Sequence, residues 1–234
     1  MMSKLTIIIP VYNEAENISV LITEIEKKLQ HPHQIFIIYD NENDNTIPIV
    51  KELQVEYGNS LSLIKNNFGE GALNAIKTGI ELVDTDYCLV MMADLSDSIE
   101  TINKMLEMAS KQEPDIICAS RYMKEGKQIG APFLKRILSM FAGLSLFYFA
   151  GVSTHDSTNN FKMYKKSFLD DIVIESSSGF ELALELVVKA HCQNRLICEV
   201  PTVWRSRILG HSRFKLLKWL PAYLKWYIKA FGCR

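Results

Sequence analysis

The sequence predicts an α/β protein built as a doubly wound, mostly parallel sheet flanked by helices, and two patterns support this. Short β-branched apolar runs, typical of strands buried on both faces, alternate with segments whose apolar residues recur at intervals of three and four, typical of helices. Strands separated by helices pair in parallel, because each crossover helix returns the chain to the same edge of the sheet. The 234 residues, 48% of them hydrophobic, suit a single domain.

The first strand is expected over residues 5–11, where an apolar, β-branched run is closed by Pro10. A helix follows, because apolar residues then recur at spacings of three and four: Ile18, Leu21, Ile22, Ile25 and Leu29. Asn13 suits the cap of this helix, and Glu14 and Glu16 suit its positive first turn.

The same alternation continues to residue 119 and becomes less regular beyond it. The remaining strands are expected at residues 35–39, 61–64, 87–92, 115–119, 161–164 and 196–203. The remaining helices are expected near 47–57 and at 71–83, 99–110, 133–150 and 180–192, with a polar turn at 154–160. The longest apolar stretch, 137–152, has about 16 residues, fewer than the roughly 20 that span a bilayer, so no transmembrane helix is expected.

Charge and cysteine content indicate the class of partner and the compartment of the protein. Twenty-six basic residues nearly balance 27 acidic ones, so no whole-molecule field favours nucleic acid as a partner. The five cysteines lack CxxC spacing, three of them lie in apolar runs, and the sequence shows no signal peptide. A reducing cytoplasm is therefore the expected compartment.

Four polar clusters follow predicted strands, at residues 10–17, 39–46, 66–74 and 93–97. Ligands of doubly wound sheets bind outside the carboxyl ends of the strands, so these clusters form the candidate site. The first cluster could instead be a helix cap with a packed tyrosine, and the second could instead be a solvated loop that caps the next helix. In the third, two closely spaced glycines permit the backbone to approach a phosphate at a helix start, although no Walker lysine pattern or GxGxxG accompanies them.

The fourth cluster carries the strongest chemical signal. An apolar strand runs directly into Asp94 and Asp97, and a carboxylate near a buried strand end needs a cation or a hydrogen-bond donor as its partner. Hard oxygen ligands in this position suit Mg²⁺ or Mn²⁺ bridging a diphosphate. The alternative is that Ser96 or Asp97 caps the following helix.

Further motifs follow these clusters in order: Ser120-Arg121-Tyr122, residues 156–161, Gly179-Phe180-Glu181 and Gly210-His211-Ser212-Arg213. The ordered set resembles family 2 glycosyltransferases of the GT-A fold, and within them the polyprenol-phosphate branch, which is similar to dolichol-phosphate mannose synthase. The resemblance covers nearly the whole chain. It implies an inverting glycosyltransferase that moves a sugar from a nucleoside diphosphate sugar to a membrane-associated acceptor, with polyprenyl phosphate as the expected acceptor.

The resemblance assigns nucleotide and metal contacts residue by residue. It implies nucleotide binding by Pro10, Tyr12, Glu14, Tyr39, Asp40, Gly69, Gly71, Ala93 and Asp94. It implies that Asp94, Ser96 and Asp97 hold Mg²⁺ or Mn²⁺.

Two positions depart from the family pattern. Tyr39 stands where the family usually has the first of two aspartates, and Met92 replaces the first aspartate of the Asp-x-Asp motif. A thioether is a poor ligand for a hard cation. A degenerate nucleotide-sugar-binding protein without catalysis is therefore the rival hypothesis.

A lipid phosphate acceptor is already anionic and needs cations rather than a base. The resemblance offers Arg121, Lys135, Ser139 and Arg207, with Arg213 in addition, for that phosphate. The expected catalytic residues are Asp94, Asp97 and Arg121. A sugar hydroxyl acceptor is the second alternative, and it requires a general base, for which Asp97, Asp156 or Glu181 are available.

The C-terminal end is basic, because Glu199 is the only acidic residue from Arg195 onward. Residues 214–234 predict a basic amphipathic helix, with four lysines close to one face: Lys215, Lys218, Lys225 and Lys229. Such a helix lies on anionic lipid or docks on the core with a lysine-rich outer face, and Pro221 is expected to break or kink it.

Residues 134–152 are either a second membrane-facing helix or a buried core helix. We expect one GT-A domain at 1–213, with a nucleotide-binding half at 1–122 and an acceptor-binding half at 123–213. The expected location is cytoplasmic, peripheral at the inner face of the membrane.

Overall fold

A seven-stranded sheet forms the centre of the protein, whose computed structural model describes residues 5–177, 179–206 and 216–233. The strand order is β3-β2-β1-β4-β7-β5-β8. The strands are β1 (Leu5–Val11), β2 (His33–Tyr39), β3 (Leu61–Lys65), β4 (Tyr87–Val90), β5 (Ile116–Ser120), β7 (Lys162–Lys165) and β8 (Ile197–Pro201). All neighbours pair in parallel except β7, which is antiparallel to β4 and to β5. The predicted doubly wound, mostly parallel sheet is confirmed.

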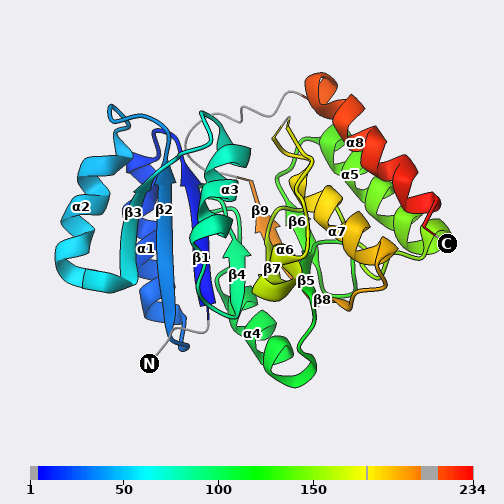
Figure 1. Ribbon diagram of the computed structural model, residues 1–234, viewed down its shortest axis with the longest axis horizontal. Coiled ribbons are helices and arrows are strands. Elements are labelled where there is room, and N and C mark those ends of the chain that lie inside the picture. The colour runs from blue at the N-terminus through cyan, green and yellow to red at the C-terminus, as the bar shows by residue number, and fades with distance from the viewer. Residues whose placement is uncertain (1–4, 178, 207–215, 234) are drawn as a thin grey trace.

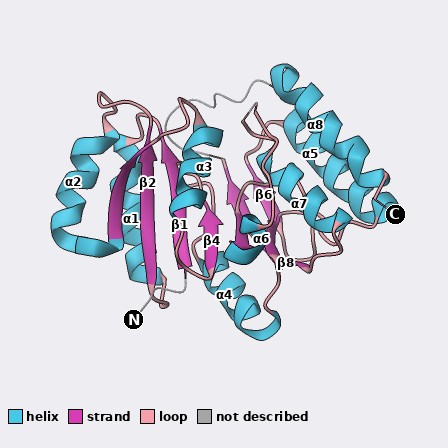
Figure 2. Cartoon of the chain, in the orientation of Figure 1, coloured by secondary structure: helices cyan, strands magenta, loops and turns pink. Residues whose placement is uncertain are grey.

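Helices cover both faces of this sheet, as Figures 1 and 2 show. The helices that share a core on one face are α1 (Ala15–Lys28), α2 (Thr46–Tyr57) and α4 (Glu100–Gln112). Those on the other face are α3 (Ala72–Leu82), α6 (Lys166–Asp170), α7 (Leu182–Cys192) and α8 (Leu216–Phe231). The strand β1 is buried along its whole length, which explains why its sequence is continuously apolar rather than alternating.

Most predicted elements are present with small shifts of their ends, and four details differ. The predicted strand 196–203 is two strands, β8 and β9 (Val203–Arg205), and β9 pairs with the unpredicted strand β6 (Lys127–Ile129) in a separate ribbon. The short helix α6 and the 3₁₀ turn η1 (Gly58–Ser60) were not predicted either. These short segments carry too few residues to show a period.

The segment Phe133–Ala150 is one continuous helix, consisting of α5 (Phe133–Ser145) and a π-helical turn η2 (Leu146–Ala150). It has 18 residues, rather than the roughly 16 counted in the sequence, and by length and composition alone it could cross a membrane. That it does not span the membrane stays a prediction. Only 22% of the helix is buried. The alternative that these residues form a buried core helix is therefore wrong.

The C-terminal helix α8 runs through Pro221 without ending there, so the predicted break is wrong. It packs against α7 and η2, with Trp226 and Ala230 fully buried. Its outer side carries lysines and apolar residues together, because Lys225 and Lys229 are exposed alongside Leu220, Leu224, Ile228 and Phe231. The helix thus docks on the domain with lysines on its outer side, as one alternative held, while the side chains of Lys215 and Lys218 lie outside the described residues.

Cys192 and Cys233 form a disulfide that joins the end of α7 to the second residue after α8, with Cα atoms 4.8 Å apart. The other cysteines are free. The 41-residue separation gave no sign of this pairing in the sequence. The pair does not support the expectation of a reducing cytoplasm, because disulfides persist chiefly in oxidising compartments.

The strand order places the candidate site. The chain turns from β1 toward β2 and β3 on one side and toward β4 on the other, so the switch point lies between β1 and β4. The loops after these two strands contain Asn13 at φ +56° and Leu95 at φ +59°, left-handed conformations that are uncommon outside glycine. Such strain concentrates at functional sites.

Candidate functional site

The loop after β4 holds Asp94 at the edge of the sheet. Asp94 is only 9% exposed, and its Oδ1 accepts a hydrogen bond from the backbone N–H of Ser96 at 3.1 Å. Ser96 is buried as well. The loop is tied to the opposite side of the site because the backbone N–H of Arg205 donates to the carbonyl of Ser96 at 3.0 Å.

Asp97 lies close enough to Asp94 for the two charges to interact. Burial, reinforced by the charge of Asp94, raises the pKa of Asp97 from 3.8 to about 7, although Arg121 and a hydrogen bond from the Met92 backbone act in the opposite direction. The Met92 side chain stands where the family has a carboxylate. Its backbone hydrogen-bonds the Asp97 carboxylate and lowers the pKa of that group. Asp97 does not cap α4, because that helix has no side-chain cap.

The residues of this loop fit a divalent cation in part. A bound cation would relieve the repulsion by Asp94 that contributes to the raised pKa of Asp97. Among the residues that the structure describes, no three His, Cys, Asp or Glu side chains are grouped to hold a metal. A cation bound by Asp94 and Asp97 would therefore take its other ligands from the diphosphate and water, as Mg²⁺ commonly does.

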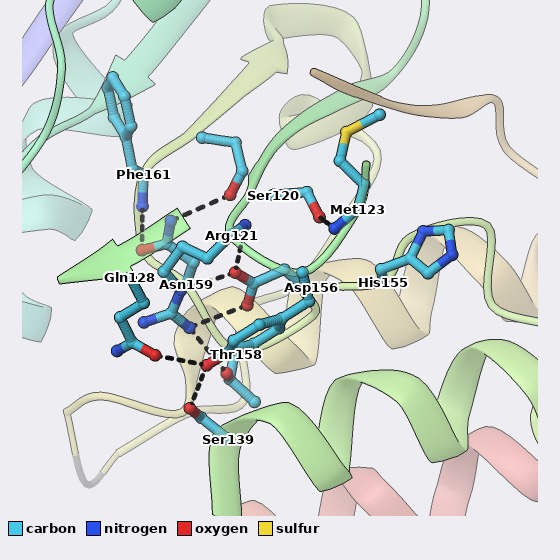
Figure 3. Close-up of polar contacts among 12 residues, drawn as sticks. Ser120, Arg121, Met123, Gln128, Ser139, His155, Asp156, Thr158, Asn159 and Phe161 are labelled. Carbon is cyan, nitrogen blue, oxygen red and sulfur yellow. Dashed lines mark hydrogen bonds and ion pairs between the residues drawn. The ribbon is translucent and has the colours of Figure 1, made fainter. Parts of the chain in front are cut away.

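Arg121, directly after β5, forms a bidentate ion pair with Asp156 (Figure 3). Arg121 Nε lies 2.6 Å from Asp156 Oδ2, Nη2 lies 2.9 Å from Oδ1, and the backbone N–H of Arg121 donates to Oδ2 at 3.0 Å. Burial alone would raise the pKa of Asp156, but the charge and hydrogen bonds of Arg121 outweigh it and lower the pKa. Asp156 is therefore an ionised partner of Arg121 and not a free general base, which was one of three candidates for that role in the sugar-hydroxyl alternative.

The turn that carries Asp156 is fixed by buried polar contacts. Lys162 is fully buried at the start of β7, and its ammonium group donates to the backbone carbonyls of Asp156 and Asn159. The Asn159 side chain donates to the carbonyl of Ala119 at 3.0 Å (Figure 3). Burial lowers the pKa of Lys162. These contacts hold Asp156, the partner of Arg121, rigidly beside the sheet.

A cationic cavity of about 240 Å³ opens next to Arg121. Its lining residues are Arg121, Tyr122, Gly126, Lys127, Gln128, Ile129 and Arg136. Within the described part of the chain, no carboxylate lines this cavity and neither Lys127 nor Arg136 has an acidic partner. Arg121 is paired with Asp156, so Lys127 and Arg136 supply the net positive charge of the cavity, and that charge favours an anionic ligand.

The predicted acceptor residues are partly gathered here. The Ser139 hydroxyl on α5 hydrogen-bonds the Tyr122 hydroxyl, which also donates to Gln128 Oε1 at 3.0 Å (Figure 3). Arg136, rather than the predicted Lys135, lines the cavity, and Lys135 precedes it on the same helix. The sequence missed Lys127 and Arg136 because exposed lysines and arginines are common on surfaces. Arg207 and Arg213 lie outside the described residues.

The loops after β1 and β2 are joined by Asp44, which the sequence did not single out. Both carboxylate oxygens of Asp44 lie 3.1 Å from the backbone nitrogen of Asn13, and the backbone N–H of Thr46 donates to Oδ1 at 2.8 Å. The Thr46 hydroxyl in turn accepts from the backbone N–H of Glu14 at 2.9 Å. Asp44 therefore fixes the left-handed backbone of Asn13, which lies between the predicted nucleotide-binding residues Tyr12 and Glu14.

Asp40 organises the glycine loop. Its Oδ1 accepts from the Asn66 side chain at 2.7 Å and its Oδ2 accepts from the backbone N–H of Gly71 at 2.8 Å. Gly69 at φ +93° and Gly71 at φ +113° occupy conformations that side chains disfavour. Asp40 and both glycines thus meet at one edge of the sheet, as predicted, and their contact with a nucleotide stays a prediction.

The remaining predicted nucleotide residues lie along the same edge. Pro10 is at the end of β1 and Ala93 is buried after β4, while Tyr12 is 48% exposed just beyond Pro10. Tyr39 ends β2, and its hydroxyl lies 3.4 Å from both Glu42 carboxylate oxygens. The predicted positions therefore share one face of the fold.

A doubly wound sheet with carboxylates at its switch point and a cationic cavity beside it belongs to the class of GT-A proteins. The family model for glycosyl transferase family 2 matches residues 6–173, which is most of the chain. The chain belongs to that family, and the predicted resemblance is confirmed.

Two curated relatives carry polyprenol-phosphate names. The dolichol-phosphate mannosyltransferase of Pyrococcus furiosus is 28% identical, with 95% of this chain and 64% of that protein covered. The polyprenol monophosphomannose synthase of Mycolicibacterium smegmatis is 25% identical, with 91% of this chain and 85% of that protein covered. The chain thus spans about two thirds of the first relative's length and most of the second.

Solved structures share the fold. S. aureus TarS in complex with UDP-GlcNAc superposes with a TM-score of 0.66 at 18% identity, over 91% of this chain and 62% of that one. Glucosyl-3-phosphoglycerate synthase from Mycobacterium tuberculosis, in complex with Mn²⁺, UDP and glucosyl-3-phosphoglycerate, superposes with a TM-score of 0.70 at 11% identity, over 98% and 80% of the two chains. The GT-A fold predicted from the sequence is confirmed.

Proposed function

We propose that this protein is an inverting glycosyltransferase that moves a sugar from a nucleoside diphosphate sugar to a polyprenyl phosphate or a similar lipid phosphate. The observation that carries this proposal is the cationic cavity beside Arg121, which adjoins the exposed apolar helix α5. The names of the two curated relatives support the choice of acceptor.

The donor is assigned to the loops after β1, β2 and β4. Tyr12 supplies an exposed ring for the base, and the backbone around Gly69 and Gly71 is open enough for close approach of a phosphate. Asp94 and Asp97 would hold Mg²⁺ or Mn²⁺, which neutralises charge on the leaving diphosphate. The Mn²⁺ and UDP bound by the fold relative from Mycobacterium tuberculosis support this choice of ion.

The acceptor phosphate is assigned to the cavity. An anionic phosphate oxygen can attack the anomeric carbon without a general base, so the protein has to position the acceptor and neutralise its charge. Arg121, Lys127 and Arg136 supply that charge, and the guanidinium groups match phosphate oxygens geometrically. Asp156 keeps Arg121 aligned for this contact.

The membrane contact is assigned to an apolar helical face made by α5, η2 and α8, which lie side by side (Figure 1). Ser145 and Tyr227 hydroxyls join the two helices at 2.9 Å. The exposed apolar residues of this face are Phe133, Leu134, Ile137, Leu138, Phe141, Tyr148, Phe149, Leu220, Leu224, Ile228 and Phe231. Exposed apolar area of this extent favours a lipid surface.

The proposal is tested by offering the protein UDP- and GDP-sugars with a short polyprenyl phosphate in mixed vesicles and detecting lipid-linked sugar phosphate by mass spectrometry. We expect lipid-linked sugar phosphate with either the UDP-sugars or the GDP-sugars. Binding of a nucleotide sugar without any product would favour the noncatalytic rival that Met92 suggests. Product on a sugar hydroxyl but not on the lipid phosphate would favour the other alternative.

A further inference from the structure

His155 lies between the turn that carries Asp156 and the helix α5–η2. Its imidazole ring stacks on Phe147 of η2, with ring centroids 3.8 Å apart and planes inclined by 23°. Its Nδ1 lies 2.5 Å from Glu199 Oε1, and its backbone N–H donates to Glu199 Oε2 at 2.9 Å. The hydroxyl of Thr154 donates to the same Oε2 at 3.0 Å. The turn is therefore held from β8 on one side and from η2 on the other.

The helix also touches this turn through its backbone. A side chain at Gly143 would clash with the carbonyl oxygen of His155 and would lie 3.4 Å from the Cα of Asp156. Ser139, four residues before Gly143, bonds Tyr122, and Phe147, four residues after it, stacks on His155. These three positions form one inward stripe of the α5–η2 helix, opposite its exposed apolar residues.

One peptide bond separates this stack from the ion pair at the site. Asp156 follows His155 directly, and its carboxylate accepts three hydrogen bonds from Arg121. A shift of the His155 ring would move the Asp156 backbone, and the rigid guanidinium fork of Arg121 would follow its partner. The α5–η2 helix is thus linked to Arg121 through the ring of His155 and the carboxylate of Asp156.

We propose that His155 is a positioning residue for sugar transfer, which fixes the Asp156 turn to the α5–η2 helix and so places Arg121. The kinetic part of this inference rests on the proposed function, in which Arg121 holds the acceptor phosphate. A loss of placement by about 1 Å lowers turnover by up to about 100-fold in enzymes. None of the contacts of the His155 ring described above involves the loops after β1, β2 and β4, so we expect donor binding to stay unchanged.

Three substitutions separate the contributions of the ring. His155→Leu removes both the stack and the bond to Glu199, His155→Phe keeps the stack, and His155→Asn keeps a hydrogen-bonding group. His31→Leu is the matched control, because His31 is exposed in the turn before β2. We expect kcat for transfer to fall by about 10- to 100-fold in His155→Leu with an unchanged donor Kd, and to recover partly in the other two variants.

A spectroscopic measurement decides the placement without turnover. In the wild type, the Arg121 Nε–H proton, assigned by its loss in Arg121→Lys, should be slow to exchange because it donates to Asp156. We expect it to exchange at least about tenfold faster in His155→Leu and to be unchanged in His31→Leu. An unchanged Arg121 signal in a folded His155→Leu protein overturns the inference. An unchanged kcat in that variant overturns it as well.

Failure of the proposed function gives a different result. If the wild type forms no lipid-linked product, the proposed function fails, while the exchange of the Arg121 proton still shows whether His155 places this group. A general loss of folding would lower donor affinity together with kcat, and that outcome would also contradict a positioning role.

Discussion

Arg121 and Asp156 are 35 residues apart in the chain and meet in a bidentate, buried ion pair at the edge of the sheet. Asp156 is fully buried, and within the described residues Arg121 is the one cation that forms an ion pair with its carboxylate. The geometry allows Arg121 to keep a fixed orientation toward the cavity that it lines.

Asp156→Asn should destabilise the protein. The substitution leaves the buried Arg121 charge without its counter-ion, and breaking one partner of a buried pair costs about 3–5 kcal/mol. Chemical denaturation measures the free energy of unfolding directly. Glu107→Gln, which breaks an exposed pair with Lys111 on α4, should leave the denaturation midpoint unchanged. Equal midpoints for wild type and Asp156→Asn would show that the pair contributes nothing.

The contribution of this pair should depend on pH. Arg121 lowers the pKa of Asp156 below its ordinary 3.8 in the folded protein, so the unfolded chain takes up the proton at a higher pH. The stabilisation is therefore complete above the unfolded pKa and is lost as the pH falls through the folded pKa. The difference in unfolding free energy between wild type and Asp156→Asn should shrink from pH 6 to pH 3. A difference that grows over this range would reverse the assigned sign.

Asp94→Asn should abolish the effect of Mn²⁺ on donor binding. Asp94 is the predicted ligand nearest the end of β4, and an amide is a weaker ligand than a carboxylate for a hard cation. Calorimetric titration of the nucleotide sugar, with Mn²⁺ and with a chelator, measures this effect. Glu70→Gln, an exposed change in the glycine loop, is a charge-matched control. Wild-type binding that does not change with Mn²⁺ would remove the metal role from Asp94.

Polar substitutions on the apolar helical face should weaken binding to vesicles. Burying a large apolar side chain contributes about 1.5–3 kcal/mol, so replacing Leu134 and Phe141 together by Ser should lower vesicle affinity by at least about tenfold. Co-sedimentation with anionic vesicles measures this. Val55→Ser provides the control, because Val55 is 89% exposed on α2, away from α5. Equal binding by all three proteins would show that this face does not contact lipid.

The sequence predicted the elements whose burial is uniform or periodic. The continuous apolar run around Ile7 predicts a strand, and the apolar spacing of three and four around Ile22 predicts a helix, because both residues lie in the core on regular elements. The antiparallel β7 was not apparent, since a four-residue strand has the same apolar pattern in either direction.

The candidate site was predicted where a residue type is itself unusual. Arg121 follows the buried strand β5 directly and Asp94 closes the apolar run that continues beyond β4, so a charge at either position is unusual. Asp44, Lys127 and Arg136 are ordinary residues for turns and surfaces, and only the three-dimensional contacts distinguish them. The pairing of Asp156 with Arg121 depends on the packing of the turn against the sheet, which no local pattern encodes.

The most direct measurement compares wild type with Arg121→Gln in transfer of a radiolabelled sugar from its nucleoside diphosphate donor to polyprenyl phosphate in vesicles. The proposed function predicts lipid-linked product with the wild type and a loss of at least about 100-fold in Arg121→Gln, with donor binding retained, because loss of a charge-stabilising donor costs about 10²–10³ in turnover. Equal product from both proteins would contradict the central role of the Arg121 cavity.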